Sequence, residues 1–400
     1  MSSTTVLEAF PKLTLDQQAA PESNNENQEF SFSKSVFNGH STRVPDDEKL
    51  VVKENDGTLT KYSVPKDYEY ADLLPSFPDT KDKPLDEVEY HDRGLHADPS
   101  FSNLFRDVTK IEHLGRDLGT VLHGVQLSQL TDVQKDELAR LMAERGVVYF
   151  PDQKQSIEEF ESLGLYYGTP HIHGANAIPR NDRWKNFHVV YTDDKNQSDT
   201  VQNVPQIRQI HTDVSFEEQP TAQTFFKALK IPSQGGDTVF YSGYAAYETL
   251  SEPLKKYLEG LTLVHSGVEQ AEMRRKAGHA TRREGILNAH PIVRTHPVTG
   301  WKSLYVSPSF SRYIPEVPRA ESDAILDFLY QHIATLSASS VKIRWAENGV
   351  VAWDNRVVVH RATYDHYPQT RHFIRIAARG EKPFLDKNSR QRKDVLSESK

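Results

Sequence analysis

The segment GVVAWDNRVVVH, residues 349–360, contains two short apolar runs separated by Asp354, Asn355 and Arg356. Valine and tryptophan favour strands, whereas Asp and Asn favour turns, so the segment predicts two strands joined by a polar turn. Many short strands with turn signals between them are typical of an antiparallel sandwich or jelly roll. Similar β-rich runs lie at residues 224–226, 238–241, 303–306 and 373–376. The predicted fold class is therefore mainly β, with helical insertions.

Helical patterns lie around these strands. Thr131 precedes an amphipathic run that ends at Gly146, which predicts a capped helix. The other expected elements are a buried strand at residues 147–150 and helices at about 157–165, 244–258 and 320–337.

The first hundred residues differ from the rest of the chain. Residues 21–28 are polar without a period, and residues 62–100 combine several prolines with many charges. Such stretches bury little apolar surface by themselves. We expect residues 1–100 to form an N-terminal extension, partly disordered and partly wrapped on the core, with order beginning near residue 105. The main domain would span 101–385, and 386–400 would form a C-terminal tail.

The composition excludes several classes of protein. The chain has 400 residues, no cysteine, 17 histidines and a net charge of −8. Without cysteine there is no disulfide, no thiolate nucleophile and no cysteine-bound metal, so histidine and carboxylates are the available strong metal ligands. The acidic balance disfavours a nucleic-acid partner, and no apolar run is long enough for a membrane helix. The first residues lack the basic region and continuous apolar core of a secretory signal, so we expect a cytoplasmic protein.

The tripeptide His211-Thr212-Asp213 is the sharpest local motif. Residues two apart on a strand point to the same face, so this His and Asp could bind one cation. His360, after the second apolar run, is the best candidate for a third ligand. Two imidazoles and one carboxylate leave open coordination positions, as in the facial triad of non-haem Fe(II) oxygenases, where a bidentate cosubstrate and O2 bind. The alternative is a strand with an unrelated surface His and Asp, because so short a motif often arises by chance.

The sequence contains three further characteristic segments: GGDT at residues 235–238, RTHPVTG at 294–300 and GEKPF at 380–384. Together with the metal motif and WDNR at 353–356, they resemble the taurine dioxygenase (TauD/TfdA) family of Fe(II)/2-oxoglutarate-dependent dioxygenases, over about residues 105–385. The resemblance implies a distorted double-stranded β-helix, the jelly-roll core of that family. It also implies Fe(II), 2-oxoglutarate and O2 as the cofactor and cosubstrates.

The resemblance assigns roles to individual residues. Iron ligands and catalytic residues are implied at His211, Asp213 and His360. Arg371 and Thr238 match the residues that hold the distal carboxylate of 2-oxoglutarate. Two arginines four apart on a strand share a face, which suits two anionic ligands. The positions implied to contact substrate are His173, Arg375, Phe310, Asn176 and Ile207.

Two of these positions depart from taurine dioxygenase. Ile207 and Asn176 stand where that enzyme has an asparagine near the substrate amine and a tyrosine. The anion end of the pocket thus matches and the amine end differs. The expected reaction hydroxylates the carbon next to sulfur of taurine or another alkyl sulfonate, giving aldehyde, sulfite, succinate and CO2.

Other interpretations stay open from the sequence. The same chemistry could act on a sulfate ester, a carboxylate such as a phenoxyacetate or amino acid derivative, or a purine. A non-catalytic, cupin-like metal-binding protein would need the metal ligands but not Arg371 and Thr238, and a nucleic-acid demethylase conflicts with the acidic balance. The expected partner is a small anionic organic substrate, with neither nucleic acid nor membrane, and the family suggests a homo-oligomer, a dimer or tetramer.

The remaining charged residues receive ordinary interpretations. His265 and His296 lie among apolar residues and are expected in the core. Glu217 and Glu218 follow the metal motif and are expected to be solvated. The basic run at 274–276 and 282–283 predicts a solvated face or a mobile loop that could also guide anions.

Overall fold

Residues 349–360 form β17 (Val350–Asp354) and β18 (Val358–Ala362) in the computed structural model, which describes residues 44–54, 57–195 and 204–398. The predicted strand, turn and strand are therefore confirmed. The two strands belong to different sheets, so the turn between them is a crossing from one sheet to the other.

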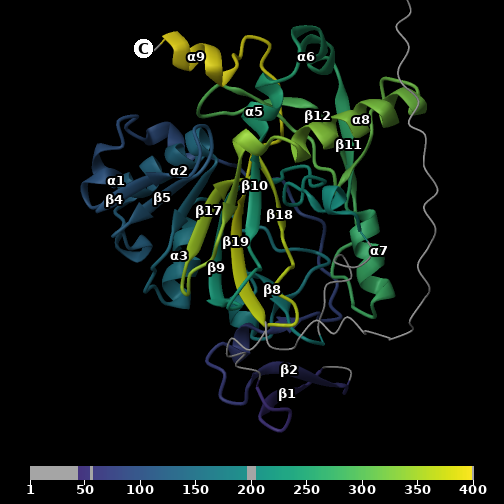
Figure 1. The fold of residues 1–400 in the computed structure, drawn as a ribbon. Coiled ribbons are helices and arrows are strands. Elements are labelled where there is room, and N and C mark those ends of the chain that lie inside the picture. Colours follow the sequence, from purple (N-terminus) through teal and green to yellow (C-terminus); the bar gives the residue numbers. More distant parts are fainter. Residues whose placement is uncertain (1–43, 55–56, 196–203, 399–400) are drawn as a thin grey trace, which may run out of the picture. The chain divides into compact units, whose positions relative to one another are not determined.

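A seven-stranded sheet is the centre of the molecule (Figure 1). Its pairs are antiparallel, except that β5 and β6 run parallel. In spatial order it comprises β4 (Lys110–His113), β5 (Thr120–His123), β6 (Val147–Phe150), β17, β9 (Thr221–Lys230), β19 (Arg371–Arg379) and β8 (His188–Thr192).

Smaller antiparallel sheets complete the β structure. One has the order β16 (Ser340–Ile343), β10 (Thr238–Ser242) and β18. The others are β12 (Leu287–Pro291) with β11 (Thr262–Ser266) and β15 (Ser311–Tyr313), β13 (Val293–Thr295) with β14 (Lys302–Leu304), β1 (Lys49–Lys53) with β2 (Leu59–Pro65), and β3 (Pro75–Ser76) with β7 (Ile178–Pro179).

Both faces of the seven-stranded sheet are buried. Along β17, Val350 and Ala352 pack in one cluster with residues of the helices α2 (Asp132–Arg145) and α3 (Ile157–Tyr166). Val351 and Trp353 pack in a second cluster with residues of β10, β16 and β18. Because strand side chains alternate between faces, burial on both sides requires the continuous apolar runs seen in the sequence. Figure 1 shows α2 and α3 on one side of the sheet and β10 and β18 on the other.

The helix predicted after Thr131 is confirmed as α2. Thr131 and Gln134 form a reciprocal capping box at its start. Gly146 follows its end with φ of 70°, and a Cβ there would lie 2.6 Å from a methyl carbon of Leu118. Only glycine fits such a position without strain.

The helices predicted at about 157–165 and 320–337 are confirmed, the one predicted at 244–258 is divided, and three helices of the described chain are not among the predictions. The helix expected at 244–258 is two short ones, α5 (Gly243–Glu248) and α6 (Glu252–Leu258). Ser251 starts α6 and Pro253 lies in its first turn, where proline is tolerated but cannot continue an earlier helix. The helix predicted at 320–337 is α8 (Arg319–Ala334), whereas α1 (Ser102–Arg106), α7 (Val268–Lys276) and α9 (Arg392–Glu398) are not predicted. The expectation of a solvated face or mobile loop at the basic run is wrong in part, because residues 274–276 end α7 and Arg282 is buried.

Regular structure begins before residue 105, so that expectation is wrong. Strands β1, β2 and β3 precede it, and β3 pairs with β7, which belongs to the later part of the chain. Tyr62 and Val64 of β2 are buried in a small cluster that Tyr191 of β8 packs against. The polar stretch at 21–28 lies outside the described residues, and the domain boundaries at 100 and 385 stay a prediction.

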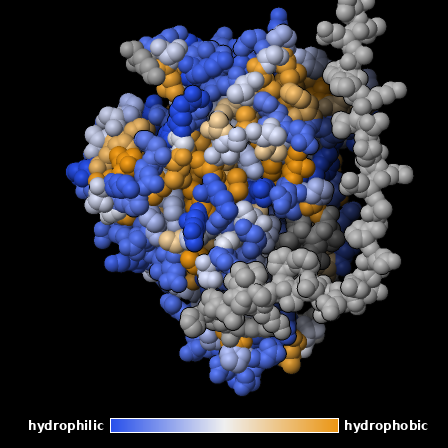
Figure 2. Space-filling model, viewed as in Figure 1, coloured by the Kyte–Doolittle hydropathy of each residue, from blue (hydrophilic) through white to orange (hydrophobic). Residues whose placement is uncertain are grey.

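The surface on the side shown in Figure 2 is mostly hydrophilic, with hydrophobic residues gathered over the central strands. Within the described part of the chain, no helix has both the length and the apolar character needed to span a bilayer.

Candidate functional site

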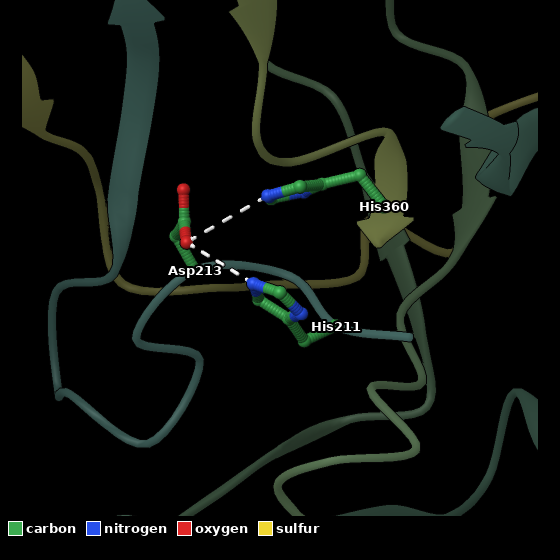
Figure 3. A group of neighbouring side chains, drawn as sticks. All are labelled: His211, Asp213 and His360. Atoms are coloured by element: carbon green, nitrogen blue, oxygen red, sulfur yellow. Dashed lines mark ion pairs between the residues drawn. The ribbon is translucent and has the colours of Figure 1, made fainter. Parts of the chain in front are cut away.

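The structure brings His211, Asp213 and His360 together, with one ligand atom of each within 4.8 Å of the others (Figure 3). The two histidines are paired through their backbones: each N–H donates to the other's carbonyl, at 2.9 and 2.7 Å. This pairing sets the imidazoles side by side, with ring centroids 4.4 Å apart. Asp213 Oδ1 lies 3.5 Å from His211 Nε2 and 3.9 Å from His360 Nε2.

Asp213 reaches this position from a turn, and the expectation that the motif lies on one strand is wrong. His211 makes an isolated bridge, and a turn follows it in which Val214 has φ of 45°. A positive φ is rare for a β-branched residue and marks a backbone held by its surroundings. Asn355 holds this backbone in place. Its side-chain amide accepts a hydrogen bond from the backbone N–H of Asp213 and donates one to the carbonyl of Asp213, both at 2.9 Å. The turn between β17 and β18 thus positions Asp213, and the strand that follows it, β18, carries His360.

The protonation states of these side chains suit a cation. Burial lowers the pKa of His360 to about 3, so its imidazole is neutral at neutral pH. Burial acts to raise the pKa of the Asp213 carboxyl, but Arg375 and the two histidines hold it well below its usual range. His211 Nδ1 lies 2.8 Å from the carbonyl of Gln209, which can only accept, so the lone pair of a neutral ring is at Nε2, facing Asp213.

The three residues therefore fit a metal ion. In the buried site, Asp213 Oδ2 and His360 Nδ1 have no hydrogen-bond partner among the described residues. Lone pairs on two imidazoles and one carboxylate converge. The positively charged group in contact with them is Arg375, which donates to Asp213. Two histidines and one carboxylate with open positions are the ligand set of non-haem iron oxygenases.

Arg375, on β19, donates to Asp213 Oδ1. It is buried and lies opposite His188 of β8 and Phe226 of β9 in the sheet. The structure thus places Arg375 against Asp213, a predicted metal ligand, and its contact with substrate stays a prediction.

Arg371, four residues before it on β19, lies on an aromatic platform. Its guanidinium carbon is 4.0 Å from the ring centroid of Phe373 and 5.6 Å from that of Phe226, and its Nε donates to the carbonyl of Gly236 at 3.0 Å. Burial lowers the pKa of Arg371 to about 10, so it stays charged at neutral pH. Among the described residues, no carboxylate lies within ion-pair distance of it, so its terminal nitrogens are available to an anionic ligand.

Thr238, two residues after Gly236, is the second predicted cosubstrate residue. The indole N–H of Trp345 donates to Thr238 Oγ1 at 3.2 Å. Because this oxygen accepts from Trp345, the hydroxyl's own proton can be donated elsewhere. A buried arginine and a hydroxyl donor beside the same glycine suit one carboxylate.

A cavity of about 1330 Å³ adjoins the metal-ligand set, with His211 in its wall. Phe310 and Asn176, two of the predicted substrate residues, also line it. Phe310 meets the His211 ring edge-on, at 6.1 Å between centroids. Ile207 instead packs against the apolar cluster around Ile210, and its contact with substrate stays a prediction.

His173 lies behind Asn176 rather than in the cavity wall. Its Nδ1 accepts from the backbone N–H groups of Ala175 and Asn176, and its Nε2 is 3.1 Å from the Asn176 side chain. Burial holds the pKa of His173 well below its usual value, so the ring is neutral. Any effect of His173 on a ligand in this cavity would pass through Asn176.

Two functional candidates are missing from the sequence predictions. His188, the first residue of β8, lines the cavity, and its buried Nδ1 has no hydrogen-bond partner in the described part of the chain. Glu217 is buried, not solvated as expected, and pairs with His171 at 3.0 Å and Arg283 at 3.4 Å. The only sequence signal for His188 is a histidine at the start of a β-branched run, and the partners of Glu217 are distant along the chain. His265 and His296 are buried as expected, and Glu218 is exposed.

The fold and the site together define a mainly β protein in which two histidines and one carboxylate converge, a combination that matches the ligand set of non-haem iron oxygenases. The sequence model of the family described as "Taurine catabolism dioxygenase TauD, TfdA family" matches residues 110–377. The chain belongs to this family.

Individual relatives agree with this membership. A Schizosaccharomyces pombe protein, named as a candidate alpha-ketoglutarate-dependent sulfonate dioxygenase, is 60% identical over 374 residues, or 92% of this chain and 95% of that one. The Saccharomyces cerevisiae alpha-ketoglutarate-dependent sulfonate dioxygenase is 38% identical over 328 residues, 79% of each chain. A taurine dioxygenase structure from Burkholderia xenovorans aligns with a TM-score of 0.59 and 28% identity, covering 71% of this chain and 95% of that one.

Proposed function

We propose that this protein is an Fe(II)- and 2-oxoglutarate-dependent dioxygenase that hydroxylates the carbon next to sulfur in a sulfonate. The hydroxylated product collapses to an aldehyde and sulfite, while 2-oxoglutarate is converted to succinate and CO2. The observation that carries the proposal is the convergence of His211, Asp213 and His360 beside a buried, charged Arg371. The names of the two yeast relatives support the sulfonate.

His211, Asp213 and His360 would hold the iron, which when bound supplies the dioxygen chemistry that no protein side chain can perform. Asn355 fixes Asp213 through two backbone hydrogen bonds and so keeps the ligand set in place. The ion pair of Arg375 with Asp213 lies within the ligand set itself.

The other charged groups orient the two organic anions. Arg371 presents a planar fork suited to the distal carboxylate of 2-oxoglutarate, and Thr238 donates its hydroxyl to the same group. Arg375 would hold the sulfonate close to the metal. Phe310 meets the His211 ring edge-on and adds an apolar surface beside it in the cavity wall.

The core of this enzyme is proposed to be the double-stranded β-helix of its family. Its support is the packing of the sheet with β10, β16 and β18 against one face of the seven-stranded sheet. A small anionic organic substrate, a cytoplasmic location and a dimeric or tetrameric assembly complete the proposal.

The experiment is a substrate screen with Fe(II) and 2-oxoglutarate that measures sulfite and succinate together. Taurine, other alkyl sulfonates, sulfate esters and carboxylates form the panel. Sulfite and succinate formed in equal amounts from a sulfonate would support the proposal. Succinate coupled only to a carboxylate would overturn the sulfonate assignment.

The variant Asp213→Ala tests the metal site, with the exposed Asp98→Ala as the matched control. We expect Asp213→Ala to abolish both products because it removes the only anionic ligand, and Asp98→Ala to keep them. Undiminished succinate formation by Asp213→Ala would contradict the assigned ligand set.

A further inference from the structure

The cavity beside the metal centre has a wall that the family's shared domain does not supply. The family match begins at residue 110, yet residues from β2, β3 and the segment after β3 line the cavity. The lining residues that the argument uses are Tyr62, Ser76, Phe77 and Asp79. The part of the chain that precedes the shared domain is thus built into the cavity.

This wall is fastened to the core by several contacts. Strand β3 pairs with β7, just after Asn176. The backbone N–H of Asp82 donates to the carbonyl of Arg282 at 2.8 Å, and Lys81 donates to the carbonyl of Thr281 at 3.1 Å. Arg282 in turn donates to the carbonyls of His173 and Asn176. The segment 75–82 and the pocket loop at 173–176 are therefore held by the same arginine.

The Phe77 side chain connects this wall to α7 and to His279, which follows that helix. Its ring stacks on His279, with centroids 3.9 Å apart and planes inclined by 14°. The guanidinium carbon of Arg274, on α7, lies 5.9 Å from the Phe77 ring, and Arg274 Nε donates to Asn176 Oδ1. Phe77, His279, Arg274 and Asn176 all line the cavity.

The size of the cavity bears on what it accepts. Its volume of about 1330 Å³ is above the range of roughly 300–1000 Å³ typical of small-molecule sites. The cavity extends from His211 to Phe77, and Arg371, Thr238 and Arg375 are not among the residues that line it. We therefore assign it to the carbon part of the substrate, beside His211. A two-carbon sulfonate held near the metal would leave the Phe77 wall without contact, whereas a longer carbon chain would reach it.

We propose that Phe77, stacked on His279, is a specificity-determining residue that selects sulfonates whose apolar carbon part is longer than two carbons. This inference rests on the proposed function for the identity of the anion, and on the cavity for the chain length. Each methylene group placed against the wall would raise affinity about threefold to fourfold.

The test compares ethanesulfonate with hexanesulfonate, using the full-length protein. Dissociation constants are measured by calorimetry and sulfite release by assay, for the wild type, Phe77→Ala and Phe77→Leu. Phe328→Ala is the matched control, because Phe328 also stacks on a histidine, His332, but lies half-exposed on α8 outside the cavity. An unchanged melting temperature and unchanged 2-oxoglutarate affinity show that each variant is folded.

We expect the wild type to bind hexanesulfonate more tightly than ethanesulfonate. Phe77→Ala should lower the affinity for hexanesulfonate at least tenfold and the affinity for ethanesulfonate less than twofold. Phe77→Leu should have an intermediate effect, and Phe328→Ala should bind both sulfonates like the wild type. Equal effects on both sulfonates, or none, would overturn the role of Phe77. Length-dependent binding without sulfite release would overturn the proposed reaction and leave the wall supported, whereas no binding of either sulfonate would overturn both.

Discussion

At the residue scale, Arg371 is the clearest case of a charge built for a ligand. It is buried, still charged, and held by aromatic rings and one carbonyl instead of a carboxylate. A buried charge without a counter-ion is costly, and an anionic cosubstrate would compensate it.

We predict that Arg371→Ala weakens the binding of 2-oxoglutarate by about 2–4 kcal/mol, or roughly 30- to 1000-fold, because a charge-assisted contact is lost. The measurements are the KM for 2-oxoglutarate and the rise in melting temperature that 2-oxoglutarate produces. The control is Arg319→Ala, which removes an exposed arginine of α8. A variant that keeps the wild-type thermal shift would contradict the role of Arg371.

Lys227 is another buried cation, on the helix-covered side of β9. We assign it no role in ligand binding, and it bears on the stability of the fold. It lies in the wall of a smaller hollow, of about 590 Å³, beside the start of α3, and burial lowers the pKa of its amine to about 8. An unfolded lysine titrates near pH 10.4. Between these values the unfolded chain binds more protons than the folded one, so the stability of the wild type rises with pH in this window.

Replacing the lysine removes this dependence. We predict that Lys227→Met unfolds with a free energy about 1–3 kcal/mol larger than the wild type at pH 7, since a buried charge is exchanged for an apolar side chain. The advantage should shrink as pH rises from 8 to about 10. Urea denaturation at several pH values measures it, with the exposed Lys154→Met as control. An advantage that persists undiminished at pH 10 would contradict the burial of the amine.

At the element scale, Glu217 joins three segments that are distant in sequence. It follows the turn that holds Asp213, it pairs with His171 before the pocket loop, and it pairs with Arg283 before β12. Arg283 also donates to the carbonyl of Ile172 at 2.7 Å. One buried carboxylate therefore fixes the loop that presents Asn176 to the cavity.

We predict that Glu217→Gln destabilises the protein by about 2–4 kcal/mol and raises the KM for sulfonate more than that for 2-oxoglutarate. The reason is that His171 and Arg283 lose a buried anion, which loosens the Asn176 loop. The neighbour Glu218 is a matched control, because it is exposed and pairs with Lys382 at the surface. Glu218→Gln should leave stability nearly unchanged, because an exposed ion pair contributes little to it. Urea denaturation measures the change in stability and steady-state kinetics the two KM values. Equal effects of Glu217→Gln and Glu218→Gln would contradict this prediction.

The elements that the sequence predicts well are those whose cause is local. Helix α2 has its cap at Thr131 and its stop at Gly146, and β17 has a continuous apolar run because both of its faces are buried. The features that it misses depend on distant partners. Asp213 meets the histidines through a turn that Asn355 holds, and Glu217 is buried because His171 and Arg283 reach it, which no neighbouring residue signals.

At the scale of the whole molecule, a buried charge network joins the segment before residue 100 to the core. Arg356, in the turn between β17 and β18, pairs with Asp354 at 2.6 Å, with Asp92 at 2.5 Å and with Glu381 at 3.2 Å. His296 pairs with the same Asp354 at 2.9 Å. The motif segments around 296, 354 and 381 thus share one ion network, to which the preceding segment contributes Asp92.

Asp92 tests whether residues 44–100 fold with the core or as an appendage. Burial acts to raise the pKa of Asp92, but the Arg356 guanidinium holds it below its usual value, so the residue is an anion at neutral pH. We predict that Asp92→Asn destabilises the whole chain by about 3–5 kcal/mol, because Arg356 is left with an uncompensated part of its buried charge. Calorimetry should show one cooperative transition at a lower temperature, whereas the exposed Asp98→Asn should melt within about 1–2 °C of the wild type. A separate early transition in Asp92→Asn, with the main transition unmoved, would show that the segment is an independent appendage and that the cavity wall at Phe77 is not part of the cooperative fold.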